Sequence, residues 1–177
     1  MHRLPGVIGK TVKLISSKST RFYLPAVITV LVDQVSKYIA RTALPANGAI
    51  TVIPGVFDLR LSYNSGAAFG MFSNQAPLFI IVALVAIFAI VKLRNAGPDS
   101  GTLSVGLGLL LGGAVGNLID RIFSRAHEVT DFLSLHISIG GQTRFWPTFN
   151  VADIAVVTGA LLVFYYVYII EKRKQDA

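Results

Sequence analysis

Four long runs of apolar residues follow one another along the chain, and shorter polar segments separate them. They cover residues 22–40, 77–93, 102–119 and 151–170. Each is close to the length of about 20 residues that a helix needs to cross a hydrocarbon core roughly 30 Å thick. One such run could be a helix in a soluble core, but four in one short chain favour membrane spans. The pattern therefore predicts an all-α polytopic membrane protein with four transmembrane helices.

The first of these runs follows a basic leader, an arrangement that a cleaved signal peptide also has. Asp33, Gln34 and Lys37 interrupt its apolar residues, however. The hydrophobic region of a signal peptide is an uninterrupted apolar segment. We therefore expect the run 22–40 to be retained as a span.

Two segments between the runs alternate apolar and polar residues, which is the period of a half-buried strand. They cover residues 57–63 and 132–139, and the second is followed by Gly140 and Gly141. Two adjacent glycines fit a two-residue hairpin turn. We expect a small extracytoplasmic β-cradle, with the apolar side chains of its strands packed on the helix ends.

Strand pairing around that turn would also bring polar residues together. If the pairing continued without a bulge, the numbers of facing residues would sum to 281, which sets Asp131 opposite Asn150. Asn150 lies about one helical turn before Asp153. Pro147 interrupts the ladder because it has no N–H to donate, so the pairing beyond it stays open.

Lysine and arginine are divided unequally between the two sides that these spans would create. Ten of the 16 precede the first span, lie at or just after the end of the second (Lys92 and Arg94) or follow the fourth; five lie in the other two loops, and Lys37 lies within the first span. The positive-inside rule then puts both termini in the cytoplasm. It divides the chain into a basic cytoplasmic leader 1–21, a membrane domain 22–170 and a cytoplasmic tail 171–177. The leader is either an amphipathic helix on the inner leaflet or without fixed structure.

The amino-acid composition excludes several classes of protein and of functional site. The 177 residues are 53% hydrophobic and only 14% charged, whereas a soluble domain has about 25% charged residues. The net charge of +7 is explained by the topology, so we expect no nucleic-acid partner. The absence of cysteine excludes disulfides, cysteine zinc sites and cysteine nucleophiles. The three histidines are not spaced as ligands on one helix, and we expect neither a metal nor a cofactor.

The polar residues of the spans gather at the ends that this topology makes external. They are Asp33, Lys37, Asn117, Asp120, Arg121, Asn150 and Asp153, and the two external loops add Asn64 and Asp131. Ionisable residues in a membrane are costly and are therefore candidates for function. The one-sided placement favours a site at the outer face. A small membrane transporter or proton-conducting protein, which would line a path through the membrane with such groups, is the alternative.

Asp131 and Asp153 are the candidates for a pair of catalytic carboxylates. A hydrolase can use one ionised carboxylate to take a proton from water and one protonated carboxylate to donate a proton. Structural roles compete with this interpretation. Asn150 and Asp153 have the spacing of a helix N-cap and an acidic third residue. Asp33 and Lys37, four residues apart on a helix, can neutralise each other.

Five short runs of residues, in this order along the chain, resemble the bacterial lipoprotein signal peptidase family, also called signal peptidase II. They are DQVSK at 33–37, YNSGAAF at 63–69, GAVGNLIDR at 113–121, VTDF at 129–132 and FNVAD at 149–153. The resemblance extends over roughly residues 24–170. The chain departs from the family in its longer basic leader and in Thr130, where valine is common.

The resemblance implies a four-helix membrane aspartyl endopeptidase in the bacterial cytoplasmic membrane, with its active site near the outer face. It would cut prolipoproteins before the diacylglyceryl-modified cysteine by a two-carboxylate mechanism that activates water. The implied partners are these signal peptides, membrane lipid and globomycin-type inhibitors, and the implied state is a monomer. The implied catalytic residues are Asp131 and Asp153, the implied substrate-binding residues are Asn64, Gly66, Asn117, Arg121 and Asn150, and the implied supporting residues are Asp33, Lys37 and Asp120.

Overall fold

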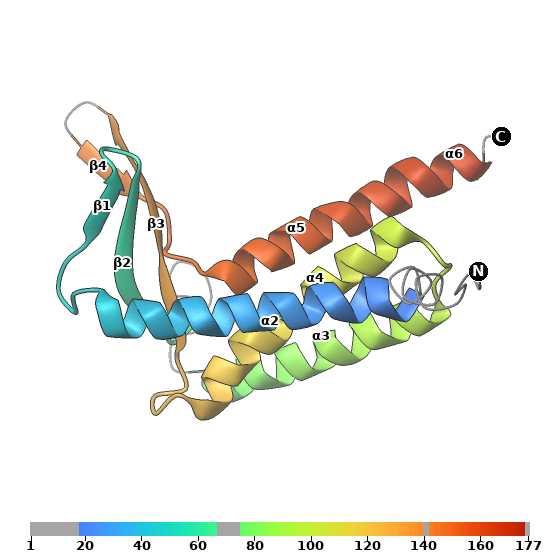
Figure 1. Cartoon of the computed structure of the whole chain (residues 1–177), viewed down its shortest axis with the longest axis horizontal. Helices are drawn as coiled ribbons and strands as arrows, with labels where there is room; N and C mark the ends of the chain where they lie inside the picture. Colours follow the sequence, from blue (N-terminus) through green and yellow to red (C-terminus); the bar gives the residue numbers. More distant parts are fainter. Residues whose placement is uncertain (1–17, 67–74, 140–141, 176–177) are drawn as a thin grey trace, which may run out of the picture.

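The computed structural model describes residues 18–66, 75–139 and 142–175. Long helices form a bundle, and a small sheet stands at one end of it (Figure 1). The helices are α2 (Lys18–Ala43), α3 (Ala76–Ala96), α4 (Gly101–Phe123), α5 (Val151–Tyr165) with a π-helical continuation (Tyr166–Glu171), and α6 (Lys172–Gln175). The strands are β1 (Ile50–Ile53), β2 (Phe57–Asn64), β3 (Val129–Ile139) and β4 (Gln142–Phe145).

The four apolar runs all form helices, as predicted. Among the described residues, three helices are long and apolar enough to cross a membrane: Ala76–Ala96, Gly101–Phe123 and Val151–Ile169. The helix α2 has 26 residues, but Asp33, Gln34 and Lys37 lower its hydropathy. The chain is therefore an integral membrane protein with three candidate spans.

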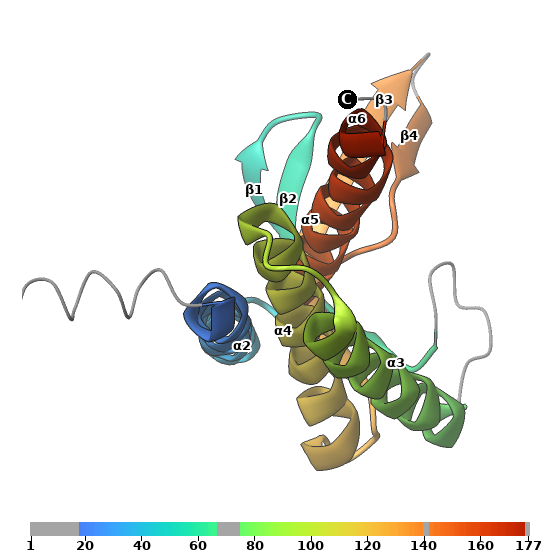
Figure 2. The ribbon, with the colours of Figure 1, turned by 90° about the vertical axis from the view of Figure 1, so that its right-hand side faces the viewer.

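The helix α4 lies at the centre of the bundle, between α2, α3 and α5 (Figure 2). Glycines that recur every four residues, at Gly108, Gly112 and Gly116, allow this close packing. A Cβ at Gly112 would lie 2.6 Å from the Cβ of Thr29 in α2, and a Cβ at Gly113 would lie 2.5 Å from an α5 carbonyl oxygen. Both helices therefore approach the α4 backbone more closely than any larger residue allows.

The sheet is antiparallel throughout and has the strand order β1-β2-β3-β4. Both predicted strands are present, and the predicted register holds from the pair Ile139–Gln142 to the pair His136–Phe145. Beyond Pro147 the pairing shifts by one residue, and Leu133 faces Phe149. The expected turn at 140–141 and most of the leader lie outside the described residues.

The orientation predicted for the apolar side of β3 is wrong. Leu135 and Ile137 are 40% and 57% exposed, whereas Ser134 on the opposite side is 1% exposed. The inner side is occupied by a polar pair, because His136 Nδ1 lies 3.4 Å from Asp58 Oδ2 and both side chains are largely buried. Groups that pair with each other can be buried, so the alternation alone did not identify the inner face.

Candidate active site

The candidate site lies where the sheet meets the ends of α2, α4 and α5 (Figure 1). The segment before α5 pairs with β3, because Leu133 and Phe149 exchange backbone hydrogen bonds of 2.9 and 3.0 Å. This pairing places Asn150, the N-cap residue of α5, beside Asp131 of β3. Two segments that are far apart along the chain are thereby joined at the site.

Asp131 is 1% exposed and accepts a hydrogen bond at each carboxylate oxygen. The side-chain amide of Asn150 donates to Oδ1 at 2.7 Å, and that of Asn64 donates to Oδ2 at 3.1 Å. Burial, and next to it the nearby charge of Asp153, outweigh the opposing effect of the two amides and of Lys37, and together these influences raise the pKa of Asp131 to about 7. Asp131 can therefore hold a proton close to neutral pH.

Asp153 lies in the first turn of α5 and also accepts two hydrogen bonds. The Asn117 side-chain amide donates to Oδ1 at 2.8 Å, and the Asn150 backbone N–H donates to Oδ2 at 3.1 Å. The Asn150 side chain in turn accepts from the Asp153 N–H, which completes a capping box. The structural interpretation of Asn150 and Asp153 as a helix start is therefore confirmed, and the same two residues also face Asp131 and Asn117.

Two asparagines connect the two aspartates. The Asn150 side-chain amide, which donates to Asp131, also lies 3.1 Å from the Asn117 side-chain oxygen. The Asn117 amide then donates to Asp153. Hydrogen bonds thus run without interruption from Asp131 through Asn150 and Asn117 to Asp153. The predicted pair and two of the predicted substrate-binding residues are together in one cluster.

Lys37 lies behind this cluster and is fully buried. Its Nζ is 2.8 Å from Asp33, 3.2 Å from Asp120 and 2.9 Å from the side-chain oxygen of Asn117. The predicted neutralisation of Asp33 by Lys37 is confirmed. Because the Lys37 ammonium donates a hydrogen bond to the side-chain oxygen of Asn117, the amide nitrogen of Asn117 is directed toward Asp153.

The two supporting aspartates each hold the backbone next to one member of the pair. Asp33 Oδ1 accepts from the N–H of Ala152 at 2.9 Å, one residue before Asp153. Asp120 Oδ2 accepts from the N–H of Thr130 at 2.9 Å, one residue before Asp131. Through these two aspartates Lys37 adds a link between the backbone of α5 and that of β3.

Arg121 is connected to Asp131 indirectly, through Gly66 and Asn64. Its Nη2 donates to the Gly66 carbonyl at 3.0 Å, and its guanidinium lies 4.5 Å from the centre of the Phe79 ring. The Gly66 N–H donates to the side-chain oxygen of Asn64 at 3.0 Å. Arg121 is 9% exposed, and its Nη1 has no hydrogen-bond partner among the described residues.

The structure adds residues that the sequence analysis missed. Gln34 donates to Asp33 at 3.1 Å, and Arg41 donates to the Thr130 hydroxyl at 2.9 Å. Arg41 lies four residues after Lys37, on the same helix face as Asp33 and Lys37, and this spacing was the signal that could have identified it. Phe79, the ring beside Arg121, lies within an apolar run and gave no signal.

Beside the pair there is a hollow of about 270 Å³, which Asp153 lines together with apolar residues. Leu135, Trp146 and Phe149 line it on the sheet side, and Ile154 lines it from α5. A chemically reactive group thus borders an apolar space. Within the described parts of the chain, no three histidine, aspartate or glutamate side chains come together as a metal site.

Comparison with known proteins identifies the family. The model of the family described as signal peptidase (SPase) II matches residues 25–169. The lipoprotein signal peptidase of Moorella thermoacetica is 41% identical over 143 residues, which are 80% of this chain and 89% of that protein. That of Oleidesulfovibrio alaskensis is 44% identical over 151 residues, which are 82% of this chain and 93% of that protein.

Solved structures agree with this result. A bacterial membrane enzyme determined by the in meso method at 2.3 Å superposes with a TM-score of 0.72 at 32% identity, over 81% of this chain and 85% of that one. A second, at 1.9 Å, has a TM-score of 0.71 at 31% identity, over 82% of this chain and 91% of that one. The chain belongs to the signal peptidase II family and is an aspartic-type peptidase. This membership favours the peptidase over the transporter alternative.

Proposed function

We propose that this member of the signal peptidase II family removes signal peptides from prolipoproteins, with Asp131 and Asp153 as the groups that activate water. The cut would come before the diacylglyceryl-modified cysteine. The observation that carries the proposal is the hydrogen-bonded connection between the two carboxylates through Asn150 and Asn117. It holds both acids in one cluster, where they can act on one peptide bond.

The two carboxylates would divide the proton transfers between them. Asp153, ionised, takes a proton from water while the water oxygen bonds to the scissile carbonyl carbon. Asp131, protonated, gives its proton to the carbonyl oxygen, and its pKa of about 7 supports this assignment. When the tetrahedral intermediate breaks the C–N bond, Asp153 passes its proton to the leaving amine. Asp131 recovers its own proton from the hydroxyl group that becomes the new carboxyl carbonyl.

Arg121 and the apolar hollow would hold the substrate. The free Nη1 of Arg121 is a buried donor without a partner among the described residues, so a backbone carbonyl of the unwound signal peptide would satisfy it. The hollow beside Asp153 is apolar on most of its lining. It would take an apolar part of the precursor, and each buried CH₂ there contributes about 0.8 kcal/mol.

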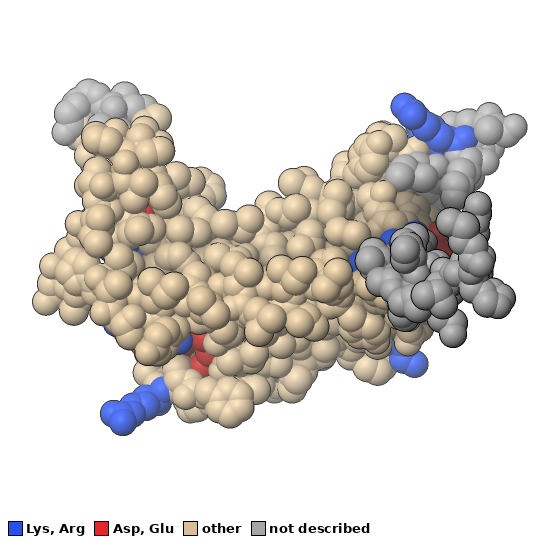
Figure 3. All heavy atoms as spheres, viewed as in Figure 1, with Lys and Arg blue, Asp and Glu red and all other residues tan. Residues whose placement is uncertain are grey.

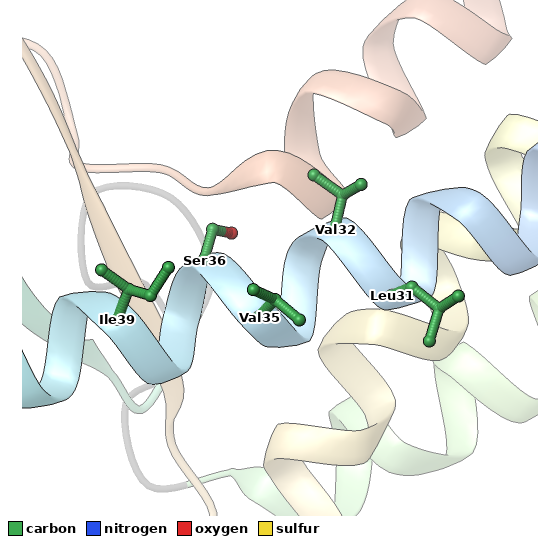
Figure 4. A pocket seen from close by; sticks show the side chains of 5 residues that line it. All are labelled: Leu31, Val32, Val35, Ser36 and Ile39. Carbon is green, nitrogen blue, oxygen red and sulfur yellow. The ribbon is translucent and has the colours of Figure 1, made fainter.

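The helix α2 would be the fourth span, as the sequence predicted. Its charged residues Asp33 and Lys37 are fully buried against α4. Its outer side is apolar, and Leu31, Val32 and Val35 line a shallow groove there that is open to the surroundings (Figure 4). Figure 3 supports immersion of the whole bundle, since charged atoms lie at its two ends and the middle of this face has none.

The distribution of lysine and arginine supports the orientation with both termini in the cytoplasm. The sheet and the site would then face outward, with residues 1–21 as the leader and 171–177 as the tail. A monomer would suffice, because all residues of the proposed site come from one chain. Globomycin-type inhibitors, expected for the family, would bind at the same place.

Cleavage of a purified precursor tests this function. The full chain in detergent is mixed with a prolipoprotein that carries diacylglyceryl on its cysteine and, separately, with the same precursor unmodified. We expect cleavage of the first and little or none of the second, because the acyl chains hold the scissile bond at the depth of the site. Equal cleavage of both would refute the substrate, and cleavage of neither would refute the function.

A further inference from the structure

A polar pocket lies on the other side of β3 from the two aspartates. Its volume is about 450 Å³, and it is lined by the ends of α2 and α4 and by the sheet. Thr130 lines it, while the next residue, Asp131, points into the aspartate cluster. This division follows from the alternation of side chains along a strand. The pocket is therefore separate from the proposed active site but only one residue away from it.

Two arginines give this pocket a positive character. Arg41 donates to the Thr130 hydroxyl and is 3.9 Å from Asp120, and its side chain is 35% exposed. Arg125 forms no hydrogen bond or ion pair with any residue in the described ranges, although it lines the same pocket. Lys37 shares its single charge between Asp33 at 2.8 Å and Asp120 at 3.2 Å, and Arg41 completes the neutralisation of Asp120. The charge of Arg125 is thus in excess over the acidic groups at the pocket.

The position of the pocket relative to the membrane is set by α4. This helix is a candidate span and ends at Phe123, so the pocket lies where hydrocarbon gives way to headgroups. Ile119 and Phe123 form an apolar part of its lining, and the Phe123 side chain is 79% exposed. In Figure 3 red and blue atoms are visible together near the end of α4. One wall is thus apolar and the other is basic.

We propose that this pocket binds a phosphate monoanion and that the phosphate belongs to a membrane phospholipid. The planar guanidinium groups of Arg41 and Arg125 match phosphate oxygens. The hydroxyl of Tyr63 is available to a polar headgroup. A soluble phosphate ester presents the same anion, but it would leave Ile119 and Phe123 without a partner, whereas acyl chains would cover them. The site does not depend on the proposed peptidase function.

Native mass spectrometry of the full-length protein in detergent tests the proposal. The probes are phosphatidylglycerol and a diacylglycerol with the same acyl chains, which lacks the phosphate. We expect the protein to retain phosphatidylglycerol and not diacylglycerol. The double variant Arg41→Gln/Arg125→Gln should bind phosphatidylglycerol at least about tenfold more weakly, because two charge-assisted contacts are lost.

Two single variants keep the test independent of folding. Arg125→Gln changes an exposed side chain and should weaken binding by itself severalfold. Arg144→Gln removes the same charge from β4, outside the pocket, and should leave binding unchanged. Equal binding of the two lipids, or an equal loss in Arg144→Gln and Arg125→Gln, would overturn the proposal.

Competition identifies the source of the phosphate. Millimolar glycerol phosphate is added to the complex with phosphatidylglycerol. We expect no displacement, which would assign the pocket to a lipid. Displacement that is lost in Arg125→Gln would uphold the phosphate site and overturn its assignment to phospholipid.

Discussion

The two ends of the helix bundle carry ion pairs of similar length in different surroundings. At the sheet end, Lys37 and Asp33 are 2.8 Å apart and both side chains are 0% exposed. At the opposite end, Arg21 and Asp99 are 2.7 Å apart, but their side chains are 31% and 59% exposed. A buried charge that loses its partner stays without water, whereas an exposed one is solvated again. Substitutions at the sheet end should therefore have large effects and those at the other end small ones.

The largest effect should come from the two proposed catalytic residues. Asp131→Asn and Asp153→Asn keep the size and polarity of each side chain but remove its proton exchange. We expect each to lower kcat for a lipidated precursor by at least about a thousandfold, measured on purified protein. The helix-start role of Asp153 alone predicts a different result, a loss of stability of about 0.3–1 kcal/mol with most activity kept.

The next effect is on stability and concerns Lys37. Lys37→Met keeps the length of the side chain but leaves Asp33 buried without a cation and leaves Asp120 with only Arg41, at 3.9 Å. We expect a loss of about 3–5 kcal/mol in the free energy of unfolding, measured by denaturant titration in detergent micelles. Lys92→Met is the matched control, because this lysine is exposed and, within the described ranges, interacts only with the aromatic ring of Phe88. A Lys37 variant as stable as this control would remove the contrast between the two ends.

A smaller, graded effect should appear with pH. The pKa of Asp131 is raised from 3.8 to about 7 in the folded protein, so the folded state binds its proton more tightly than the unfolded state does. Stability should therefore fall as pH rises from about 4 to about 7 and then level off. The unfolding temperature followed over this range should show this dependence in the wild type and a weaker one in Asp131→Asn. Parallel curves would contradict the raised pKa.

Catalytic activity should depend on pH through the protonation of Asp131 as well. Above pH 7 the ionised Asp131 can no longer act as the acid, so kcat/KM should decline by up to about tenfold per pH unit. A profile that keeps rising to pH 9 would show that Asp131 is not the acid.

The smallest effect is expected at the exposed end. Arg21→Ala or Asp99→Ala removes a surface pair, and we expect a change of about 0–1 kcal/mol in the free energy of unfolding. The same denaturant titration measures it, at low and at high salt. A loss comparable to that of Lys37→Met would mean that burial is not what distinguishes the two ends.

Features that depend on residues close together in the sequence could be predicted, and features that depend on distant residues could not. Local rules identified the helices, the strand register up to Pro147, the Asp33–Lys37 pair and the capping box of Asn150 and Asp153, because each depends on neighbours within a few residues. The bond from Asp33 to the Ala152 N–H joins residues 119 positions apart. No periodicity reports such a contact.

The inner face of β3 and the polar residues of α2 show a second limit of prediction from sequence: burial of paired polar groups is not visible in the pattern. Alternation indicates that a strand has two faces, but not which one is buried when polar groups such as Asp58 and His136 pair in the interior. The run 22–40 predicted a span, but the charged residues of α2 lower its hydropathy below that of the three candidate spans, although these charges face inward. In both places the physical reason is the same: pairing between distant residues removes the cost of burying a charge.

The central claim is that Asp131 and Asp153 act as one unit, and a double-variant cycle tests it most directly. The rate of cleavage of a lipidated precursor is measured for the wild type, Asp131→Asn, Asp153→Asn and the variant with both changes, with expression and membrane insertion checked for each. If the two residues act as one unit, the double variant should be no more than about threefold slower than the slower single variant. Losses that multiply in the double variant, or a single variant that keeps substantial turnover, would contradict the two-carboxylate mechanism.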